Sequence, residues 1–270
     1  MPIVNETIDL SAERYNQHET HDDVEFILSV IGERPKRVLE VGCGFGRILL
    51  ALANVGHDVT GIDVDEDDLE NLSATAKSLG LKNVYWRKAD AVNDDWGSGF
   101  DVVVLAGNIL FNIENIASAP AYKKAQQAFI QKAAAALAPG GYVYVGYCPF
   151  APNGRTLTRP GQSCEDDGSI FGVWECTEDD GSTETHSITP GSFDEETGIL
   201  KFTKYLEQRL ANGKIIKTQT ERVKHYVTLP QLREWLANAG FTIELECEDF
   251  DKNPINDDSC QVIIYAKKNS

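Results

Sequence analysis

Short apolar runs alternate with amphipathic helical segments over residues 37–147 and again over residues 228–266. Apolar runs between turn residues predict buried strands, and apolar positions at helical spacing predict the helices that cover them. The strands are expected at 37–41, 58–63, 84–87, 100–105, 142–146, 241–247 and 261–266, and the helices after Gly46, after Asp65, from Pro120 to about Leu137, and after Thr228. This order predicts an α/β, doubly wound sheet of seven strands.

Residues 150–227 break this alternation. They combine Gly, Pro, Asp and Thr with β-like runs, and Asn212-Gly213 separates two alternating segments, Leu200 to Leu210 and Lys214 to Lys224. Asn and Gly both tolerate positive φ, so the pair predicts a hairpin turn. The segment is therefore interpreted as an antiparallel β insertion after the fifth strand. Pro139-Gly140-Gly141 is expected to turn the chain into that strand.

The first βα turn carries the clearest chemical signal. The segment from Val38 to Gly46 reads VLEVGCGFG, and Asp63 ends the next strand. Close glycines allow backbone N–H groups to touch a ligand, and an acid at the neighbouring strand end can bind a ribose, which predicts a nucleoside cofactor. A dinucleotide fingerprint would place its third glycine where Arg47 stands, which disfavours an oxidoreductase. The plainer alternatives are a tight turn without a ligand and Asp63 as a helix cap.

Composition narrows the function classes. The net charge of −17 argues against nucleic acid as a partner, because such binding draws on Lys and Arg at phosphates. No apolar run approaches the roughly 18 residues that span a bilayer, and the start of the chain lacks a secretory signal. The six cysteines form no C-x-x-C pair, which fits a cytoplasmic protein with reduced thiols and no zinc site.

The G-x-G-x-G loop preceded by Glu40 resembles motif I of the class I S-adenosylmethionine (SAM)-dependent methyltransferases. Gly107-Asn108 followed by ILFNI, together with the long insertion, is similar to the glycine N-methyltransferase and sugar amine N-methyltransferase type. The resemblance implies a Rossmann-like sheet of six parallel strands with an antiparallel last strand, SAM as cofactor and S-adenosylhomocysteine as product. It divides the chain into a helical lid (1–34), a SAM-binding core (35–149), the insertion (150–227) and the completion of the core (228–270).

The same resemblance assigns the cofactor residues. Asp63 would accept hydrogen bonds from both ribose hydroxyls, Asp90 would accept one from the adenine amino group beside the Ala91 N–H, and Ala106 to Asn108 would face the methionine moiety. The whole expected set is Glu40, Gly42, Cys43, Gly44, Gly46, Asp63, Val64, Asp90, Ala91, Ala106, Gly107 and Asn108. Taken alone, Asp90 could equally be an ordinary strand-end aspartate.

The acceptor side departs from the family pattern. Glycine-methylating enzymes carry an arginine after the fifth strand, where this chain reads GYCPF from Gly146, so glycine is not the expected acceptor. A lid arginine of the family falls near His18 to His21, and the catalytic candidates are His18, His21 and Tyr15. The two histidines could suggest a metal, but no third ligand is identifiable and a solvated helix start explains them better.

The candidate pocket aromatics are Phe111, Tyr147, Trp174, Tyr205 and Tyr226, for which ordinary packing is the alternative.

The resulting hypothesis is methyl transfer by in-line displacement to a small metabolite, most simply to an amine nitrogen. Alignment of the reactants and exclusion of water would then matter more than a strong base. The alternatives are O-methylation of a small molecule and a non-catalytic SAM-binding or interaction module. The strands of the insertion could pair between subunits to form a homo-oligomer or could cover the pocket. Nucleic acid and membrane partners are not expected.

Overall fold

The computed structural model describes residues 22–113, 119–147, 162–164, 170–177, 181–194, 196–256, 259 and 261–269. A seven-stranded sheet forms its centre, in the order β11-β12-β5-β4-β1-β2-β3. Only β12 runs antiparallel to its neighbours, so the expected arrangement of six parallel strands and an antiparallel last strand is confirmed. The strands are β1 (Arg37–Val41), β2 (Asp58–Asp63), β3 (Val84–Lys88), β4 (Phe100–Leu105), β5 (Leu137–Tyr147), β11 (Phe241–Cys247) and β12 (Val262–Lys268).

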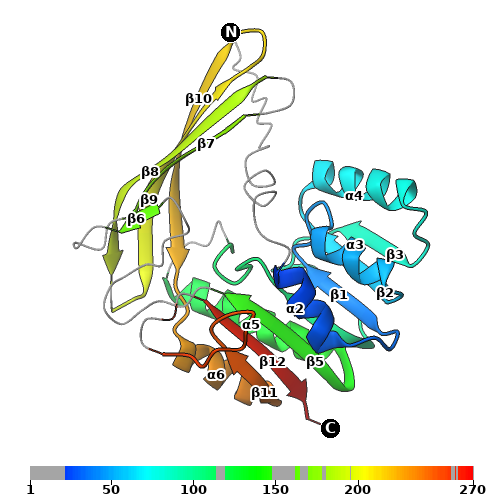
Figure 1. The fold of residues 1–270 in the computed structure, drawn as a ribbon. Helices are drawn as coiled ribbons and strands as arrows, with labels where there is room; N and C mark the ends of the chain where they lie inside the picture. The colour runs from blue at the N-terminus through cyan, green and yellow to red at the C-terminus, as the bar shows by residue number, and fades with distance from the viewer. Residues whose placement is uncertain are drawn as a thin grey trace.

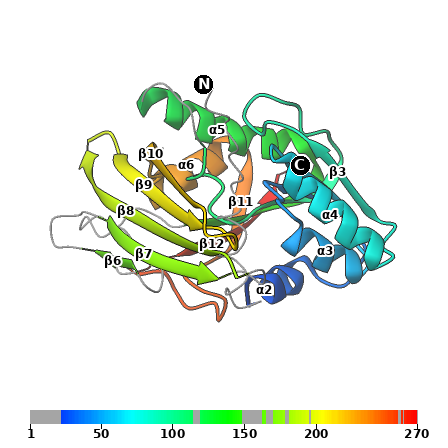
Figure 2. The ribbon, with the colours of Figure 1, turned by 90° about the horizontal axis from the view of Figure 1, so that it is seen from above.

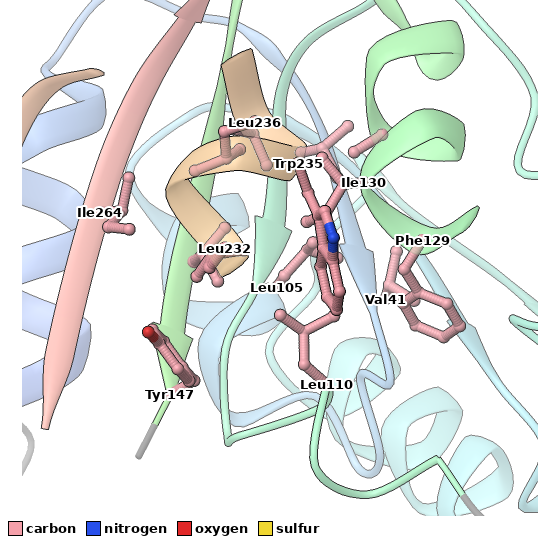
Figure 3. Close-up of a cluster of buried hydrophobic side chains, with 14 of the residues drawn as sticks. Val41, Leu105, Leu110, Phe129, Ile130, Tyr147, Leu232, Trp235, Leu236 and Ile264 are labelled. Atoms are coloured by element: carbon pink, nitrogen blue, oxygen red, sulfur yellow. The ribbon is translucent and has the colours of Figure 1, made fainter. Parts of the chain in front are cut away.

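Helices cover both faces of this sheet (Figure 2). On one face lie α2 (Asp22–Ile31), α3 (Arg47–Asn54) and α4 (Glu66–Ser78), and on the other lie α5 (Ala119–Ala136) and α6 (Leu229–Asn238). Each face has its own apolar core, and Figure 3 shows the one beneath α5 and α6. Burial of these side chains, at about 25 cal/mol per Å² of apolar surface, is the main force that holds the layers together.

Local sequence signals fix the helix starts. The Asp65 side chain accepts hydrogen bonds from the backbone N–H groups of Asp67 and Asp68 at the beginning of α4. Thr228 and Gln231 form a reciprocal capping box at the beginning of α6, with Pro230 in the first turn. Both starts agree with the sequence prediction.

The start of β5 differs from the prediction. The strand begins at Leu137, which pairs with Phe100, and the ladder resumes where Tyr142 pairs with Val102. Residues 138–141 therefore bulge out of the ladder, with Gly140 at φ 74, instead of preceding the strand. The helix and the strand consequently join without a separate loop.

The insertion forms a separate five-stranded antiparallel sheet in the order β10-β9-β8-β7-β6 (Figure 1). Its strands are β6 (Gln162–Cys164), β7 (Ile170–Thr177), β8 (Thr183–Asp194), β9 (Ile199–Arg209) and β10 (Ile215–His225). The predicted hairpin joins β9 to β10: Gly213 has φ 81, and the Asn212 side chain accepts a hydrogen bond from the Lys214 N–H. Figure 1 shows the sheet rising from the core beside α5 and α6.

A buried amide ties the insertion to the core. The Gln126 Nε2 on α5 donates to the carbonyls of Leu110 and His225, at 2.8 and 3.0 Å, and Gln126 Oε1 lies 2.7 Å from His225 Nδ1. Burial, and secondarily the charge of Lys123, lowers the pKa of His225 to about 4. The ring is therefore neutral near pH 7, and its Nδ1 carries the proton that Gln126 accepts.

Replacement of Gln126 with Leu should destabilise the fold by about 2–4 kcal/mol, because the Leu110 and His225 groups would lose their buried partner. Urea unfolding measures the effect. Gln127→Ala, on the next and less buried position of α5, is the control and should cost far less. Equal losses of unfolding free energy in the two variants would show that the Gln126 hydrogen bonds add no stability of their own.

Candidate functional site

The glycine loop lies between the carboxyl end of β1 and the start of α3. Gly42, Gly44 and Gly46 have φ of 74, 48 and 90, a region that side chains with a Cβ disfavour. A Cβ on Gly46 would lie 2.8 Å from Leu72 Cδ1, and one on Gly42 would lie 2.7 Å from Ile109 Cδ1. Conformation and space therefore both require glycine at these two positions.

Asp63, at the carboxyl end of β2, holds this loop. Its Oδ2 accepts a hydrogen bond from the Gly44 N–H at 2.8 Å, and its Oδ1 accepts one from the Asp65 N–H at 3.0 Å. Each carboxylate oxygen can accept a second hydrogen bond, so Asp63 can hold the loop and still receive two hydroxyl donors. Val64 beside it is an apolar side chain left 59% exposed.

The backbone N–H groups of the loop are largely used inside the protein. Those of Gly42 and Cys43 donate to the Ile62 carbonyl, that of Gly44 donates to Asp63, and that of Gly46 donates to the Cys43 carbonyl. These four N–H groups thus already have partners inside the protein, and the assignment of the loop to a cofactor stays a prediction. A pyrophosphate needs such donors, so this loop is poorly equipped for a dinucleotide.

Glu40, on β1, is buried beneath the loop. Burial raises the pKa of its carboxyl to about 8, although the nearby Arg47 charge acts in the opposite direction. The Glu40 Oε2 has no hydrogen-bond partner among the described residues. Burial also raises the pKa of the neighbouring Cys43 thiol, so Cys43 is no ready nucleophile.

Arg47 stands where a dinucleotide loop would have a glycine, and here it binds the preceding helix. Its guanidinium makes two hydrogen bonds to the Asp23 carboxylate of α2, at 2.6 and 2.5 Å. Both side chains are only 18% exposed. This bidentate pair fixes α2 beside the loop, and the sequence prediction did not include it. Two features of the sequence could have indicated this ion pair: the acidic residues in the first turn of α2, and an arginine in place of a glycine of the dinucleotide motif.

Asp90 follows β3 and organises a tight turn. Burial acts to raise its pKa, but the hydrogen bonds that it accepts from Asn93 and from the Val92 N–H hold the pKa below its usual value. The Lys132 ammonium of α5 donates to the carbonyls of Ala91, Val92 and Asp94. Trp96 Nε1 also donates to the Ala91 carbonyl. The turn that would meet the adenine is therefore held rigidly from within the core.

Residues 106–108 follow β4 and face the glycine loop. Gly107 and Asn108 both adopt left-handed conformations, at φ 60 and 58, and the Ala106 carbonyl accepts a hydrogen bond from the Ile109 N–H. Ile109 then packs against Gly42. The three predicted strand-end segments thus meet at one edge of the sheet, because β4, β1, β2 and β3 are neighbouring parallel strands.

Two of the predicted pocket aromatics lie together. The rings of Phe111 and Tyr226 have centroids 4.5 Å apart, and the Lys224 ammonium lies 5.4 Å from the centroid of Phe111. Lys224 and Tyr226 come from the end of β10 and the residues that follow it, whereas Phe111 follows β4. The insertion therefore meets the cofactor edge of the core at this aromatic pair.

The other acceptor-side candidates lie elsewhere. Tyr147 is buried and belongs to the apolar cluster under α6, where Figure 3 shows it at the margin beside Leu232. Tyr205 pairs with Gln219, which places it on the opposite sheet face from Lys224. The backbone of Trp174 pairs with His186 in the insertion sheet. Tyr15, His18 and His21 lie outside the described residues, and their roles stay predictions.

Within the described part of the chain, no group of three or more His, Cys, Asp or Glu side chains could hold a metal ion. None of the helices described there is long and apolar enough to cross a membrane. Cys43 and Cys247 are free and buried.

Comparison with known proteins assigns the family. A family model described as a methyltransferase domain matches residues 32–191, more than half of the chain. The chain belongs to the methyltransferase domain family. The interpretation as a class I SAM-dependent methyltransferase, with SAM as cofactor, is confirmed at the level of this family.

Individual relatives agree with this family in sequence and in fold. A ubiquinone biosynthesis O-methyltransferase from Shewanella pealeana is 32% identical over 110 residues, which are 40% of this chain and 42% of that protein. The chain thus matches about two fifths of the length of this curated relative. The CcbJ methyltransferase from Streptomyces caelestis shares the fold at TM-score 0.69 and 20% identity, over 93% of this chain and 91% of that one.

A SAM-bound amino pentose methyltransferase from Micromonospora echinaspora, involved in calicheamicin biosynthesis, also shares the fold, at TM-score 0.67 and 17% identity. Its match covers 96% of this methyltransferase chain and 95% of that one. The likeness therefore extends through the inserted sheet as well as the core.

Gly42→Ala should raise the dissociation constant for S-adenosylhomocysteine at least about ten-fold, because the new Cβ would lie 2.7 Å from Ile109 Cδ1 and would force the Ile109 side chain or the loop to shift. Isothermal calorimetry measures this. Gly56→Ala is the matched control, since Gly56 has φ 99 and no heavy atom within 4 Å of its added Cβ. Comparable losses of affinity in both variants would assign the effect to backbone strain alone.

Glu40→Gln should change how stability depends on pH. The Glu40 carboxyl binds its proton more tightly in the folded state, so the wild-type protein loses stability as the pH rises from about 4.5 to about 8. The variant lacks this loss, and its unfolding free energy relative to wild type should rise between pH 5 and pH 8. Chemical unfolding at several pH values measures the difference, with exposed Glu70→Gln as control. A pH-independent difference would contradict the burial argument.

Proposed function

We propose that this protein transfers a methyl group from SAM to an amine nitrogen of a small metabolite. The observation that carries the proposal is the strand-end edge itself. There Asp63 holds a glycine loop whose N–H groups are largely occupied, so the loop suits a nucleoside thioether better than a phosphate.

The residues fit SAM in their chemistry. Asp63 would accept from the ribose hydroxyls, Val64 offers an apolar surface to the adenine, and Asp90 with Ala91 would meet its edge. Glu40 supplies a buried carboxyl group beneath the loop, and its Oε2 has no hydrogen-bond partner among the described residues. Ala106 to Asn108 would meet the methionine part. Bound at these residues, SAM would offer an electrophilic methyl carbon for in-line attack by the acceptor lone pair, with breakage of the C–S bond and a neutral thioether as leaving group.

The protein's own contribution is alignment and exclusion of water, which can lower a barrier by roughly 7–11 kcal/mol. The Arg47–Asp23 pair would hold α2 over the loop, and Phe111 with Tyr226 would bound the acceptor side. The acceptor nitrogen must lose a proton before or after attack. Tyr15, His18 and His21 remain the candidates for assisting that step.

An amine acceptor is supported by the amino pentose methyltransferase, whose fold matches 96% of this chain, the inserted sheet included. O-methylation is the second candidate, because the sequence relative is a ubiquinone biosynthesis O-methyltransferase. Incubation with radiolabelled SAM and matched amine and hydroxyl acceptors separates the two. Tight SAM binding without any turnover would favour a non-catalytic module.

Asp63→Ala should weaken S-adenosylhomocysteine binding on the order of 100-fold, because two charge-assisted hydrogen bonds would be lost and the loop released. Calorimetry measures the affinity. Asp67→Ala, in the exposed first turn of α4, should leave it unchanged. Near-wild-type affinity of the Asp63 variant would contradict the proposed cofactor site.

A further inference from the structure

Arg47 is the first residue of α3 and follows the glycine loop directly. Its Nη1 and Nη2 atoms donate to the two oxygens of the Asp23 carboxylate, at 2.6 and 2.5 Å, and both side chains are 18% exposed. Helices α2 and α3 lie against each other on one face of the sheet (Figure 2). The guanidinium is therefore held in one orientation at the end of the loop, while part of it stays accessible to solvent.

The bond to Asp23 uses one edge of the guanidinium. Arginine carries five N–H groups in a planar fork. A carboxylate bound end-on, as that of Asp23 is here, takes one hydrogen from each Nη atom. The side edge, formed by Nε and Nη2, has the geometry to bind another carboxylate through two parallel hydrogen bonds. Arg47 can therefore hold α2 and an anionic group of a ligand at the same time.

The charges around the loop make Arg47 the place for such a group. In the described part of the chain, three charged side chains act most on the buried Glu40 carboxyl beneath the loop: Arg47, Asp63 and Asp23. Arg47 alone of the three is positive. The acids would repel a ligand carboxylate at this loop unless that carboxylate lay against the guanidinium.

The start of α3 supplies a matching set of polar groups. No side chain caps this helix at Gly46, and a helix start without a cap favours an anion. The Leu49 N–H of the first turn donates to the carboxyl of Glu40. Glu40 is buried, and its Oε2 has no hydrogen-bond partner among the described residues, which favours a ligand with a donor group. An arginine beside a buried carboxyl group matches the carboxylate and the ammonium of an amino acid.

We propose that Arg47 binds the carboxylate of the methionine moiety of SAM through its side edge, while Asp23 holds the other edge of the guanidinium. Because the ligand is the same cofactor, the inference rests on the proposed function. With Asp63 at the ribose, two charged side chains on either side of the loop bind the two polar ends of one ligand. Arg47 is then a cofactor ligand as well as the anchor of α2, and Asp23 is a positioning residue.

Two ligands that differ only in the carboxylate test this role. Isothermal calorimetry compares S-adenosylhomocysteine with its decarboxylated analogue, which keeps the amine, the thioether and the nucleoside. Arg47→Gln should raise the dissociation constant for S-adenosylhomocysteine about 10- to 100-fold, because two charge-assisted hydrogen bonds would be lost. The dissociation constant for the decarboxylated analogue should stay unchanged or fall, since that ligand has no negative group for Arg47 to bind.

Asp23→Asn is the matched control, because it breaks the same ion pair and leaves the guanidinium in place. Any loss of affinity caused by a loosened α2 should affect both ligands alike, so the ratio of their two dissociation constants should stay at the wild-type value. Arg47→Lys should lower the preference for the carboxylate only in part, because an ammonium keeps the charge but lacks the planar fork. If Arg47→Gln misfolds and loses both ligands, the Arg47→Lys ratio decides.

An Arg47→Gln protein that keeps the wild-type ratio of dissociation constants would overturn the inference and leave the cofactor site intact. A ratio that changes equally in Asp23→Asn would assign the effect to the anchoring of α2 and would overturn the inference as well. An Arg47→Lys ratio equal to that of the wild type, where Arg47→Gln has misfolded, would have the same meaning. If the wild-type protein bound neither ligand, the proposed function would fail together with this inference.

Discussion

The hydrogen bond from the Gly44 N–H to the Asp63 carboxylate is the interaction on which the site depends. It joins the carboxyl end of β2 to the turn after β1, and so it places an acid beside a loop in which Gly42 and Gly46 leave no free space for a Cβ. The N–H groups of Gly42, Cys43 and Gly46 donate to the carbonyls of Ile62 and Cys43, so these three donors are already used within the protein. One carboxylate thus shapes the loop to which we assign the cofactor.

The elements around that loop are fixed by polar contacts from outside the motif. Arg47 binds Asp23 of α2, Lys132 binds the turn after β3, and Gln126 joins the turn after β4 to the end of β10. Each of these contacts joins different elements of the fold. The apolar cores supply most of the stability, and the polar contacts specify where each loop rests.

The sequence was sufficient for the parts that depend on local periodicity. The seven strands, the capping box at Thr228 and the Asn212-Gly213 turn follow from patterns a few residues long. The contacts of Arg47, Gln126 and Lys132 join residues far apart in the chain, so no local pattern could reveal them. The bulge at residues 138–141 was missed because a Pro-Gly-Gly segment looks the same inside a strand as before one.

The same distinction applies to the candidate site. Cofactor positions at strand ends could be located because the topology brings these ends to one edge. Acceptor positions could not, because a one-residue change of register moves a side chain such as Tyr205 to the other face of a sheet.

The amide of Gln126 has a consequence for any attempt to build a minimal version of this enzyme. An excised core without the inserted sheet would retain Leu110 but would strip Gln126 of its histidine partner, leaving an unsatisfied polar group in a dry interior. A truncated catalyst would therefore need an apolar residue at that position and a new anchor for the adjoining turn. The insertion is thus an integral component of the scaffold, and it cannot be treated as a detachable accessory.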